Sequence, residues 1–221
     1  MTISKRLRAI SDFISDNSFI LDVGCDHALL DVYCALNKKN VKAIASDIKE
    51  GPLAVAKENV KKYDVSSKVT VLLGDGLSTY QTGVDTVVIS GLGSSTIVSI
   101  LNKGSKVLPN VDKLIISSNN DYCFLRKSIC DLGFCISDEI MVYDNDKFYP
   151  VILFKKGHKV YDYYELKYGP VLLDKMDKDF IGYLNNEKSK LFDIYRMLRL
   201  KHMRKRLKVK KDIKFIEKKL R

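Results

Sequence analysis

Two patterns of apolar residues follow one another along the chain, with a change near Gly157. Before this point, short β-branched and aliphatic runs alternate with longer segments of helical periodicity. The short runs predict seven strands, at Phe19–Val23, Val41–Asp47, Lys68–Leu73, Val84–Ser90, Lys113–Ser117, Glu139–Tyr143 and Tyr149–Phe154. Between the first five strands the chain is long enough for crossover helices, among them Pro52–Tyr63, Ser94–Asn102 and Tyr122–Leu132.

Strands that alternate with helices indicate a parallel, doubly wound sheet with helices on both faces. The last two predicted strands are separated only by Asp144–Lys147, which is too short for a helix, so we expect them to form a hairpin at one edge. Parallel strands followed by such a hairpin are typical of Rossmann-like methyltransferases. The sequence therefore predicts an α/β fold with a seven-stranded Rossmann-like methyltransferase sheet, in a domain of residues 1–157.

Beyond Gly157 the apolar residues recur at spacings of three, four and seven, which places them on one stripe of a helix. They are Leu184, Leu191, Ile194 and Leu198, followed by Val209, Ile213, Ile216 and Leu220. We expect two helices folded back as an antiparallel coiled coil in a domain of residues 158–221, with the turn in the His202–Lys208 region.

Composition places this chain among globular proteins. Its 221 residues leave room for one full-sized domain and a small appendage, and 46% of them are hydrophobic. No apolar run approaches the roughly 18 residues of a membrane span, and no signal peptide pattern follows the N-terminus. We therefore expect a cytoplasmic protein, a monomer, without a membrane partner. The five cysteines and three histidines have neither disulfide nor zinc spacing, so no metal site is expected.

The net charge of +11 is concentrated in the last third of the chain. Of the 38 lysines and arginines, 21 lie from Lys155 onward, together with only 9 of the 27 acidic residues. A neutral body with a strongly basic appendage is typical of proteins that bind nucleic acid. The alternative is a solvated helical face without a partner. The residues expected to contact RNA are Arg6, Arg196, Arg199, Lys201, Arg204, Lys205, Arg206, Lys208, Lys210 and Lys211.

The loop after the first predicted strand carries the first candidate chemistry. Asp22 and Gly24 stand where the first parallel strand of a doubly wound sheet runs into a loop and a helix, the usual position of a nucleotide. Gly24 allows the backbone to approach a ligand closely. Because an acidic residue precedes the glycine and the full G-x-G-x-x-G is missing, the loop favours a cationic ligand over a pyrophosphate. S-adenosylmethionine carries both a sulfonium and an α-ammonium group.

Carboxylates also follow the next two strands. Asp47 ends the second strand, where an acid accepts hydrogen bonds from ribose hydroxyls, and Asp75 follows the third, within reach of an adenine amino group. Each acid alone is compatible with a helix cap or a turn. Three acids at the ends of three successive strands favour a cofactor site.

In order and spacing, several motifs of the chain resemble those of the bacterial tRNA adenine-22 N1-methyltransferases. These motifs are Asp22-Val23-Gly24-Cys25-Asp26-His27-Ala28, Asp47 with Gly51-Pro52, Gly74-Asp75-Gly76-Leu77, Gly91-Leu92-Gly93, Leu125-Arg126, Glu139, Lys147 with Tyr149, and Gly169-Pro170. The resemblance covers nearly the whole chain. It implies methyl transfer from S-adenosylmethionine to N1 of an adenine in tRNA, with S-adenosylhomocysteine as product, by a Rossmann-like domain followed by a coiled coil.

From the residues and the resemblance together we assign candidate site residues. Those for the cofactor are Asp22, Gly24, Cys25, His27, Asp47, Ile48, Asp75, Gly76, Gly91 and Gly93. Asp26 is the candidate for stabilising positive charge on the purine or accepting a proton from it, and Asn119 for holding the adenine edge. The alternative role of Asp26 is to brace the loop. Tyr122 and Phe124 are candidates for stacking on an unpaired base.

The chain departs from the family pattern on both sides of the site. Leu29 and Asp31 replace a tyrosine and a proline after the loop histidine, and Ser90-Gly91-Leu92-Gly93-Ser94 and Ser117-Ser118-Asn119 differ where the target base is expected to enter. Two alternatives stay open. The chain could methylate another RNA or a protein, or it could be a non-catalytic RNA-binding protein that retains a cofactor pocket.

Overall fold

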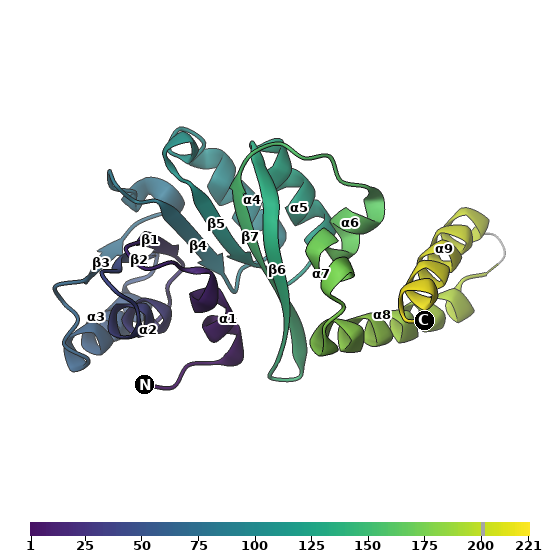
Figure 1. The fold of residues 1–221 in the computed structure, drawn as a ribbon, viewed down its shortest axis with the longest axis horizontal. Helices are drawn as coiled ribbons and strands as arrows, with labels where there is room; N and C mark the ends of the chain where they lie inside the picture. The colour runs from purple at the N-terminus through teal and green to yellow at the C-terminus, as the bar shows by residue number, and fades with distance from the viewer. Residues whose placement is uncertain (200–201) are drawn as a thin grey trace.

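A computed structural model describes residues 1–199 and 202–221, and its centre is a seven-stranded sheet with the order β3-β2-β1-β4-β5-β7-β6 (Figure 1). The strands are β1 Phe19–Val23, β2 Lys42–Asp47, β3 Val69–Leu73, β4 Thr86–Ser90, β5 Lys113–Ser117, β6 Phe134–Asp144 and β7 Lys147–Lys156. The first five strands pair in parallel, and β7 pairs antiparallel with β5 and β6. The predicted fold class is therefore confirmed, with β6 starting five residues earlier than expected.

Helices cover both faces of the sheet. One face packs against α1 Lys5–Phe13, α2 Leu29–Asn37 and α3 Glu50–Lys62, and the other against α4 Ser94–Lys103 and α5 Tyr122–Asp131. Short 3-10 turns lie at η1 Gly76–Thr79 and η2 Leu108–Asn110. Because both faces are covered, β1, β4 and β5 are buried nearly throughout, which accounts for their continuous β-branched runs.

The β6–β7 hairpin closes one edge of the sheet, as predicted. Its two-residue loop, Asn145 and Asp146, has φ values of 49° and 61°. Left-handed conformations at both loop residues are those of a type I′ turn, which Asn and Asp tolerate and which matches the twist of the two strands. The hairpin is therefore a local feature that the sequence specifies well.

Four more helices follow the sheet: α6 Tyr163–Tyr168, α7 Pro170–Lys175, α8 Lys178–Met197 and α9 Met203–Lys219. The last two lie side by side and project beyond the sheet edge (Figure 1). A third apolar cluster joins them to the sheet domain through Met141 of β6, Tyr168, Leu172, Phe180 and Ile216. The paired helices α8 and α9 are called the arm below.

The arm differs from the prediction in two respects. The predicted turn region is wrong, because α8 ends at Met197 and α9 begins at Met203, so that 203–208 is helical. Ile194 is 42% exposed and does not join the buried stripe, whereas Val209, Ile213 and Ile216 are buried as expected. Ile194 lies near the end of α8, where little of α9 covers it.

The start of α9 carries an unusual charge arrangement. His202 precedes the helix without a side-chain cap, and the first turn contains Arg204, Lys205 and Arg206 and no acidic residue. The Arg206 guanidinium lies 4.2 Å from the centre of the Tyr195 ring and donates hydrogen bonds to the carbonyls of Tyr195 and Leu198. Arg206 thus ties the start of α9 to the end of α8.

A buried ion pair fixes the helical segment to the sheet. Arg126 of α5 and Glu139 of β6 are 1% and 0% exposed, with Nε 2.7 Å from Oε1. Arg126 also donates to the carbonyls of Leu166 and Lys167 at the end of α6, and Glu139 Oε2 accepts from the Val171 N–H at the start of α7. Burial raises the pKa of Glu139 and Arg126 opposes this rise.

Gly169 lies between these two helices with a φ of +100°. A Cβ at this position would stand 2.5 Å from Glu139 Oε2 and 2.8 Å from an Arg126 nitrogen. Both the conformation and the close approach therefore require glycine. The residues Arg126, Glu139 and Gly169-Pro170, which are far apart in the sequence, form a single joint.

The substitution Glu139→Gln should lower the free energy of unfolding by roughly 3 kcal/mol or more, because it leaves the Arg126 charge buried without a counter-ion. Urea denaturation followed by circular dichroism measures the change. The matched control is Asp131→Asn, which breaks the exposed Lys127–Asp131 pair of α5 and should alter stability by no more than about 0.5 kcal/mol. Equal effects of the two substitutions would contradict the role given to the joint.

Candidate active site

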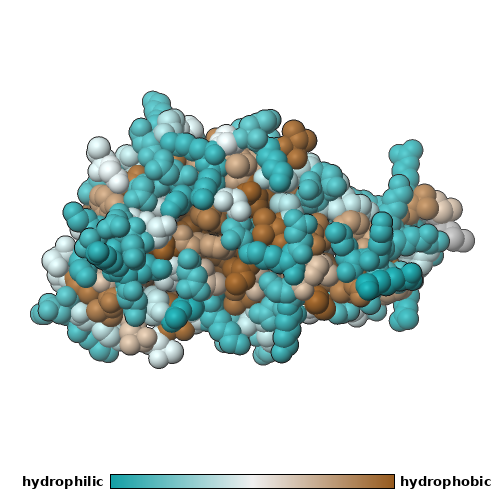
Figure 2. Space-filling view, viewed as in Figure 1, coloured by the Kyte–Doolittle hydropathy of each residue, from teal (hydrophilic) through white to brown (hydrophobic). Residues whose placement is uncertain are grey.

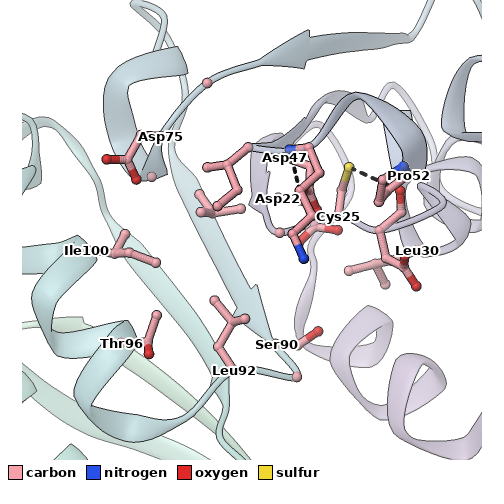
Figure 3. Close-up of a pocket in the computed structure, with 18 of the residues that line it drawn as sticks. Asp22, Cys25, Leu30, Asp47, Pro52, Asp75, Ser90, Leu92, Thr96 and Ile100 are labelled. Atoms are coloured by element: carbon pink, nitrogen blue, oxygen red, sulfur yellow. Dashed lines mark hydrogen bonds between the residues drawn. The ribbon is translucent and has the colours of Figure 1, made fainter. Parts of the chain in front are cut away.

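A cavity of about 800 Å³ opens at the carboxyl ends of the parallel strands. Its walls come from the loops after β1, β2, β3 and β4, from α4 and from Arg6 of α1. Figure 3 shows Asp22 and Asp47 on one side, Asp75 across from them, and Ser90, Leu92, Thr96 and Ile100 along the α4 side. The strand ends thus bring together residues that are separated by more than 50 positions in the chain.

The loop between β1 and α2 has a constrained backbone. Gly24, Asp26 and Ala28 all have positive φ values, of 75°, 52° and 54°. Left-handed backbone is uncommon for a buried alanine and costs about 1 kcal/mol or more. Strain of this kind persists where the surroundings hold the loop in a functional shape.

Hydrogen bonds to neighbouring elements hold this loop. The N–H groups of Gly24 and Cys25 donate to the Ser46 carbonyl at 2.8 and 3.0 Å, and Asn59 of α3 donates to the His27 carbonyl at 2.9 Å. Cys25 is buried, and desolvation raises the pKa of its thiol, so it remains a neutral packing residue. The exposed Asp26 carboxylate lies 3.5 Å from Nδ1 of His27.

Two carboxyl groups meet beneath the loop. Asp22, at the end of β1, lines the cavity and is 4% exposed, while Asp31, in the first turn of α2, is fully buried. Neither carboxylate oxygen of Asp31 has a hydrogen-bond partner among the described residues, and the charge of Asp31 adds to the burial that raises the pKa of Asp22. Burial raises the pKa of both groups. Asp22 was predicted at the site, whereas Asp31 was noted only as a departure from the family pattern.

The part of the cavity formed by the loops after β2 and β3 combines acids with apolar surface. Asp47 Oδ1 accepts a hydrogen bond from the Lys49 N–H at 3.0 Å, which turns the loop after β2. Ile48 is 63% exposed and lines the cavity. Oδ2 of Asp75 lies 3.6 Å from Nζ of Lys103 in α4. Gly76 adopts a φ of +57° beside Ile100. This end offers carboxylate acceptors next to an apolar side chain.

The serines that depart from the family pattern brace the loops after β4 and β5. Ser94 and Ser118 are buried, with their hydroxyls 2.8 Å apart, and Ser118 also contacts the carbonyls of Leu92 and Asn120. Ser94 N–H donates to the Asn120 side chain at 2.9 Å. Ser117 is buried as well. The hydroxyls of Ser94 and Ser118 therefore support the loop backbone. The Ser117 hydroxyl has no hydrogen-bond partner among the described residues, and Ser90 lines the cavity.

Most candidate cofactor residues line the cavity, and two candidate site residues do not. Gly93 caps α4 outside the cavity, next to Asn120. Asn119 lies in a neighbouring hollow of about 630 Å³, which also contains Tyr122 and Tyr149, and donates to the Gly91 carbonyl at 2.6 Å. The cofactor candidates that line the cavity are Asp22, Gly24, Cys25, His27, Asp47, Ile48, Asp75, Gly76 and Gly91, together with the catalytic candidate Asp26.

Arg6 stands where the two hollows meet. It lines the cofactor cavity, and its guanidinium lies 4.7 Å from the centre of the Tyr149 ring in the neighbouring hollow. Tyr122 is half-buried and donates to the Phe148 carbonyl, whereas Phe124 is 42% exposed on α5 outside both hollows. Of the two aromatic candidates, only Tyr122 is near the site.

The remaining basic candidates lie on the arm. Hydrophilic residues predominate over α8 and α9 in Figure 2, and the basic candidates that are exposed there are Arg196, Arg204, Lys205, Lys208, Lys210 and Lys211, with Arg199 just beyond α8. Lys201 lies outside the described residues. Arg206 is half-buried by its contacts with α8. In the part of the chain that the structure describes, no helix is long and apolar enough to cross a membrane.

Sequence comparison identifies relatives of the whole chain. Residues 3–152 match the family model of the methyltransferase domain. The tRNA (adenine(22)-N(1))-methyltransferase of Bacillus subtilis is 30% identical over 205 residues, which cover 90% of this chain and 86% of that protein.

Solved structures agree with this relationship. A Streptococcus agalactiae protein of the NADB-Rossmann superfamily is 30% identical, with a TM-score of 0.93 over 100% of this chain and 98% of that one. TrmK of M. capricolum, solved with S-adenosylhomocysteine, is 29% identical, with a TM-score of 0.85 over 100% and 98% of the two chains. The common fold, the cavity at the strand ends and the identity over nearly the full length lead to one conclusion: this chain belongs to the family of the tRNA (adenine(22)-N(1))-methyltransferases.

Proposed function

We propose that the protein transfers a methyl group from S-adenosylmethionine to N1 of adenine 22 of tRNA and releases S-adenosylhomocysteine. The observation that carries this proposal is the cavity at the strand ends, lined by Asp22, Asp47 and Asp75, in a chain 30% identical to a tRNA (adenine(22)-N(1))-methyltransferase over 90% of its length.

The residues of the cavity fit the cofactor. Asp22 is a buried acid without an ion-pair partner among the described residues, which suits a cationic ammonium group. The exposed side chain of Ile48 next to Asp47 suits an adenosine, whose ring needs apolar contact and whose ribose needs an acceptor. No side chain caps α2, so its first turn can receive a carboxylate. When bound, the cofactor supplies a methyl group on a positively charged sulfur.

The acceptor enters where the two hollows meet. Adenine N1 has a lone pair at neutral pH, so the chain has to align the base and accommodate the positive charge that develops on it. The exposed carboxylate of Asp26 at the cavity is suited to that charge. Asn119 positions the Gly91 loop through its hydrogen bond to the Gly91 carbonyl, and its amide oxygen, which accepts no hydrogen bond from the described residues, can face a base edge.

In this proposal the arm binds the tRNA. Its exposed lysines and arginines match the phosphate backbone in charge, and they hold the RNA without reading its sequence. Residues 1–157 then carry the chemistry and 158–221 the RNA binding, in a monomer that acts in the cytoplasm.

The direct test is transfer of labelled methyl from S-adenosylmethionine to unmodified tRNA, with nucleoside analysis and reverse-transcription arrest to map the position. We expect 1-methyladenosine at position 22 and loss of the product when adenine 22 is replaced by guanine. Methylation of a different RNA or position would replace the proposed substrate. Cofactor binding without transfer to any RNA would favour the non-catalytic alternative.

Replacing Asp26 with asparagine should lower kcat about 100-fold or more, because the amide cannot neutralise charge on the purine. The Kd of S-adenosylhomocysteine should change less than about threefold. Asp64→Asn is the matched control, because Asp64 is another exposed aspartate with positive φ, at 54°, and lies away from the cavity. Wild-type kcat in Asp26→Asn would assign Asp26 to loop bracing alone.

Neutralising Arg204, Lys205 and Lys210 together, as glutamines, should weaken tRNA binding about tenfold or more and reduce its salt dependence by a slope of roughly two to three. Filter binding at several salt concentrations measures both. The control removes the same charge from α3 with Lys57, Lys61 and Lys62 changed to glutamine, all of which are exposed. If both triple variants lose the same affinity, net charge rather than the arm governs binding.

A further inference from the structure

The hollow beside the cofactor cavity, called the second hollow below, lies between the sheet domain and the arm. Its walls come from the start of α5 and the loop before it, from the β6–β7 hairpin, from α6 and from α8. Its volume of about 630 Å³ is in the range of sites for small organic ligands. Asn119 of the second hollow donates to the carbonyl of Gly91, which lines the cofactor cavity. Nζ of Lys167, another wall residue, lies 2.6 Å from Oδ2 of Asp212 in α9, so the second hollow adjoins both the cavity and the arm.

Aromatic side chains form much of the wall of the second hollow. They are Tyr122, Phe148, Tyr149 and Tyr183. The Tyr122 O–H donates to the Phe148 carbonyl at 3.3 Å. The centre of the Tyr183 ring lies 6.0 Å from that of Phe148 and 6.4 Å from that of Tyr122. These contacts join α5, the hairpin and α8, and the resulting wall suits a flat ligand such as a nucleobase.

Tyr183 of α8 has a hydroxyl group without a partner. The residue is 9% exposed and lines the second hollow, and its hydroxyl forms no hydrogen bond with a described residue, whereas that of Tyr122 does. Burial raises the pKa of Tyr183, so the hydroxyl stays protonated and can both donate and accept a hydrogen bond. A tyrosine that is nine-tenths buried usually has a hydrogen-bond partner, which a ligand in the second hollow would supply.

The charged groups of the second hollow leave one lysine available to a ligand. Asp121 caps α5, and Asp146 accepts a hydrogen bond from a tyrosine hydroxyl of β6. Glu187 pairs with Lys190 at 3.0 Å. Lys147, which is exposed at the start of β7, forms no ion pair within residues 1–199 and 202–221. A lysine of this kind suits a phosphate group.

These three features match the three parts of a nucleotide. An unpaired base stacks on aromatic rings, its edge exchanges hydrogen bonds with side chains, and its phosphate binds a lysine. The target adenine has to place N1 at the methyl group in the cofactor cavity. A base in the adjoining hollow therefore belongs to another nucleotide of the same RNA.

We propose that the second hollow binds an unpaired tRNA nucleotide next to the target adenine, with its base on the aromatic wall, the base edge at the Tyr183 hydroxyl and the phosphate at Lys147. The inference rests on the proposed function, since it assumes that tRNA is the substrate. It assigns α8 a contact with a base, in addition to the phosphate contacts of the arm. Because the neighbouring nucleotide is held, the backbone of the target nucleotide is fixed and its adenine is aligned with the methyl group. Tyr183 is a positioning residue, because it acts through the neighbouring nucleotide.

Removal of single bases from the tRNA tests the subsite. Two tRNAs assembled from synthetic halves lack the base at position 21 or at position 23 and keep adenine 22. For the wild type we expect kcat/KM to fall about tenfold or more with one of the two, because stacking of the missing base is lost. The Kd of S-adenosylhomocysteine should stay the same in the presence of either tRNA. A tRNA without one base of the anticodon loop is the control and should be methylated like intact tRNA.

Tyr183→Phe removes only the hydroxyl and should lower kcat/KM for intact tRNA about three- to tenfold, as expected for one hydrogen bond. With the sensitive abasic tRNA the same substitution should lower kcat/KM less than twofold, because the partner of the hydroxyl is already missing. A purely structural role of Tyr183 would give equal losses with both tRNAs. Tyr63→Phe is the matched control and should change neither value, because Tyr63 is a half-buried tyrosine that follows α3 outside both hollows.

Lys147→Gln is the second variant and tests the phosphate contact. It should weaken tRNA binding about threefold and reduce the slope of its salt dependence by roughly one. Intact and abasic tRNA should lose the same factor, because the abasic tRNA keeps its phosphates. Lys42→Gln is the matched control, since Lys42 is an exposed lysine at the amino end of β2, and it should bind tRNA like the wild type.

The outcomes separate the subsite from the proposed function. Equal kcat/KM of the wild type for intact tRNA and both abasic tRNAs would overturn the subsite, and so would equal losses of Tyr183→Phe with intact and abasic tRNA. Unchanged tRNA binding by Lys147→Gln would overturn the phosphate contact. Intact tRNA is the reference in every assay, and no methyl transfer to it by the wild type would overturn the proposed function and the subsite with it.

Discussion

The ion pair of Arg126 and Glu139 is the constraint on which the arrangement of the whole molecule depends. Desolvating two charges is expensive, and it is tolerated here because their remaining hydrogen-bonding groups bind the end of α6 and the start of α7. The hydrogen-bonding groups of the buried pair therefore fix the positions of α6 and α7. It sets where α7 leaves the sheet edge, and through α8 it sets where the basic surface of the arm stands relative to the cavity.

Much of the sheet could be predicted because its strands have to be buried on both faces. β1 and β5 were predicted with their observed bounds, since continuous β-branched runs bounded by polar residues leave few alternatives. α2 was harder. Six of its nine residues are buried, so its apolar residues show no clear stripe. β6 was predicted to begin only at Glu139 because Asp138 interrupts the apolar pattern before it. Glu139 itself is buried in an ion pair with Arg126, a contact that no local pattern encodes.

Some residues of the site could likewise be predicted from the sequence, and others could not. Asp22, Asp47 and Asp75 could be predicted because the ends of parallel strands meet at one edge, and topology alone brings them together. Asp31 could not, because an acid in the first turn of a helix has the pattern of an ordinary dipole interaction until its burial is known. The contacts of Ser94, Ser118 and Asn119 with neighbouring loops could not be predicted either, since whether a loop side chain supports the backbone or faces a ligand depends on contacts between separate loops.

The charge arrangement at the start of α9 affects the stability of this helix. The N-terminal end of a helix carries partial positive charge, and acidic side chains usually occupy it. Here three basic side chains stand in that first turn and no side chain caps it, so the free protein keeps like charges together at a cost. A phosphate group would provide what a capping carboxylate provides elsewhere. At the start of α9 the helix dipole and the side chains thus oppose each other, and an anion bound there would stabilise the helix.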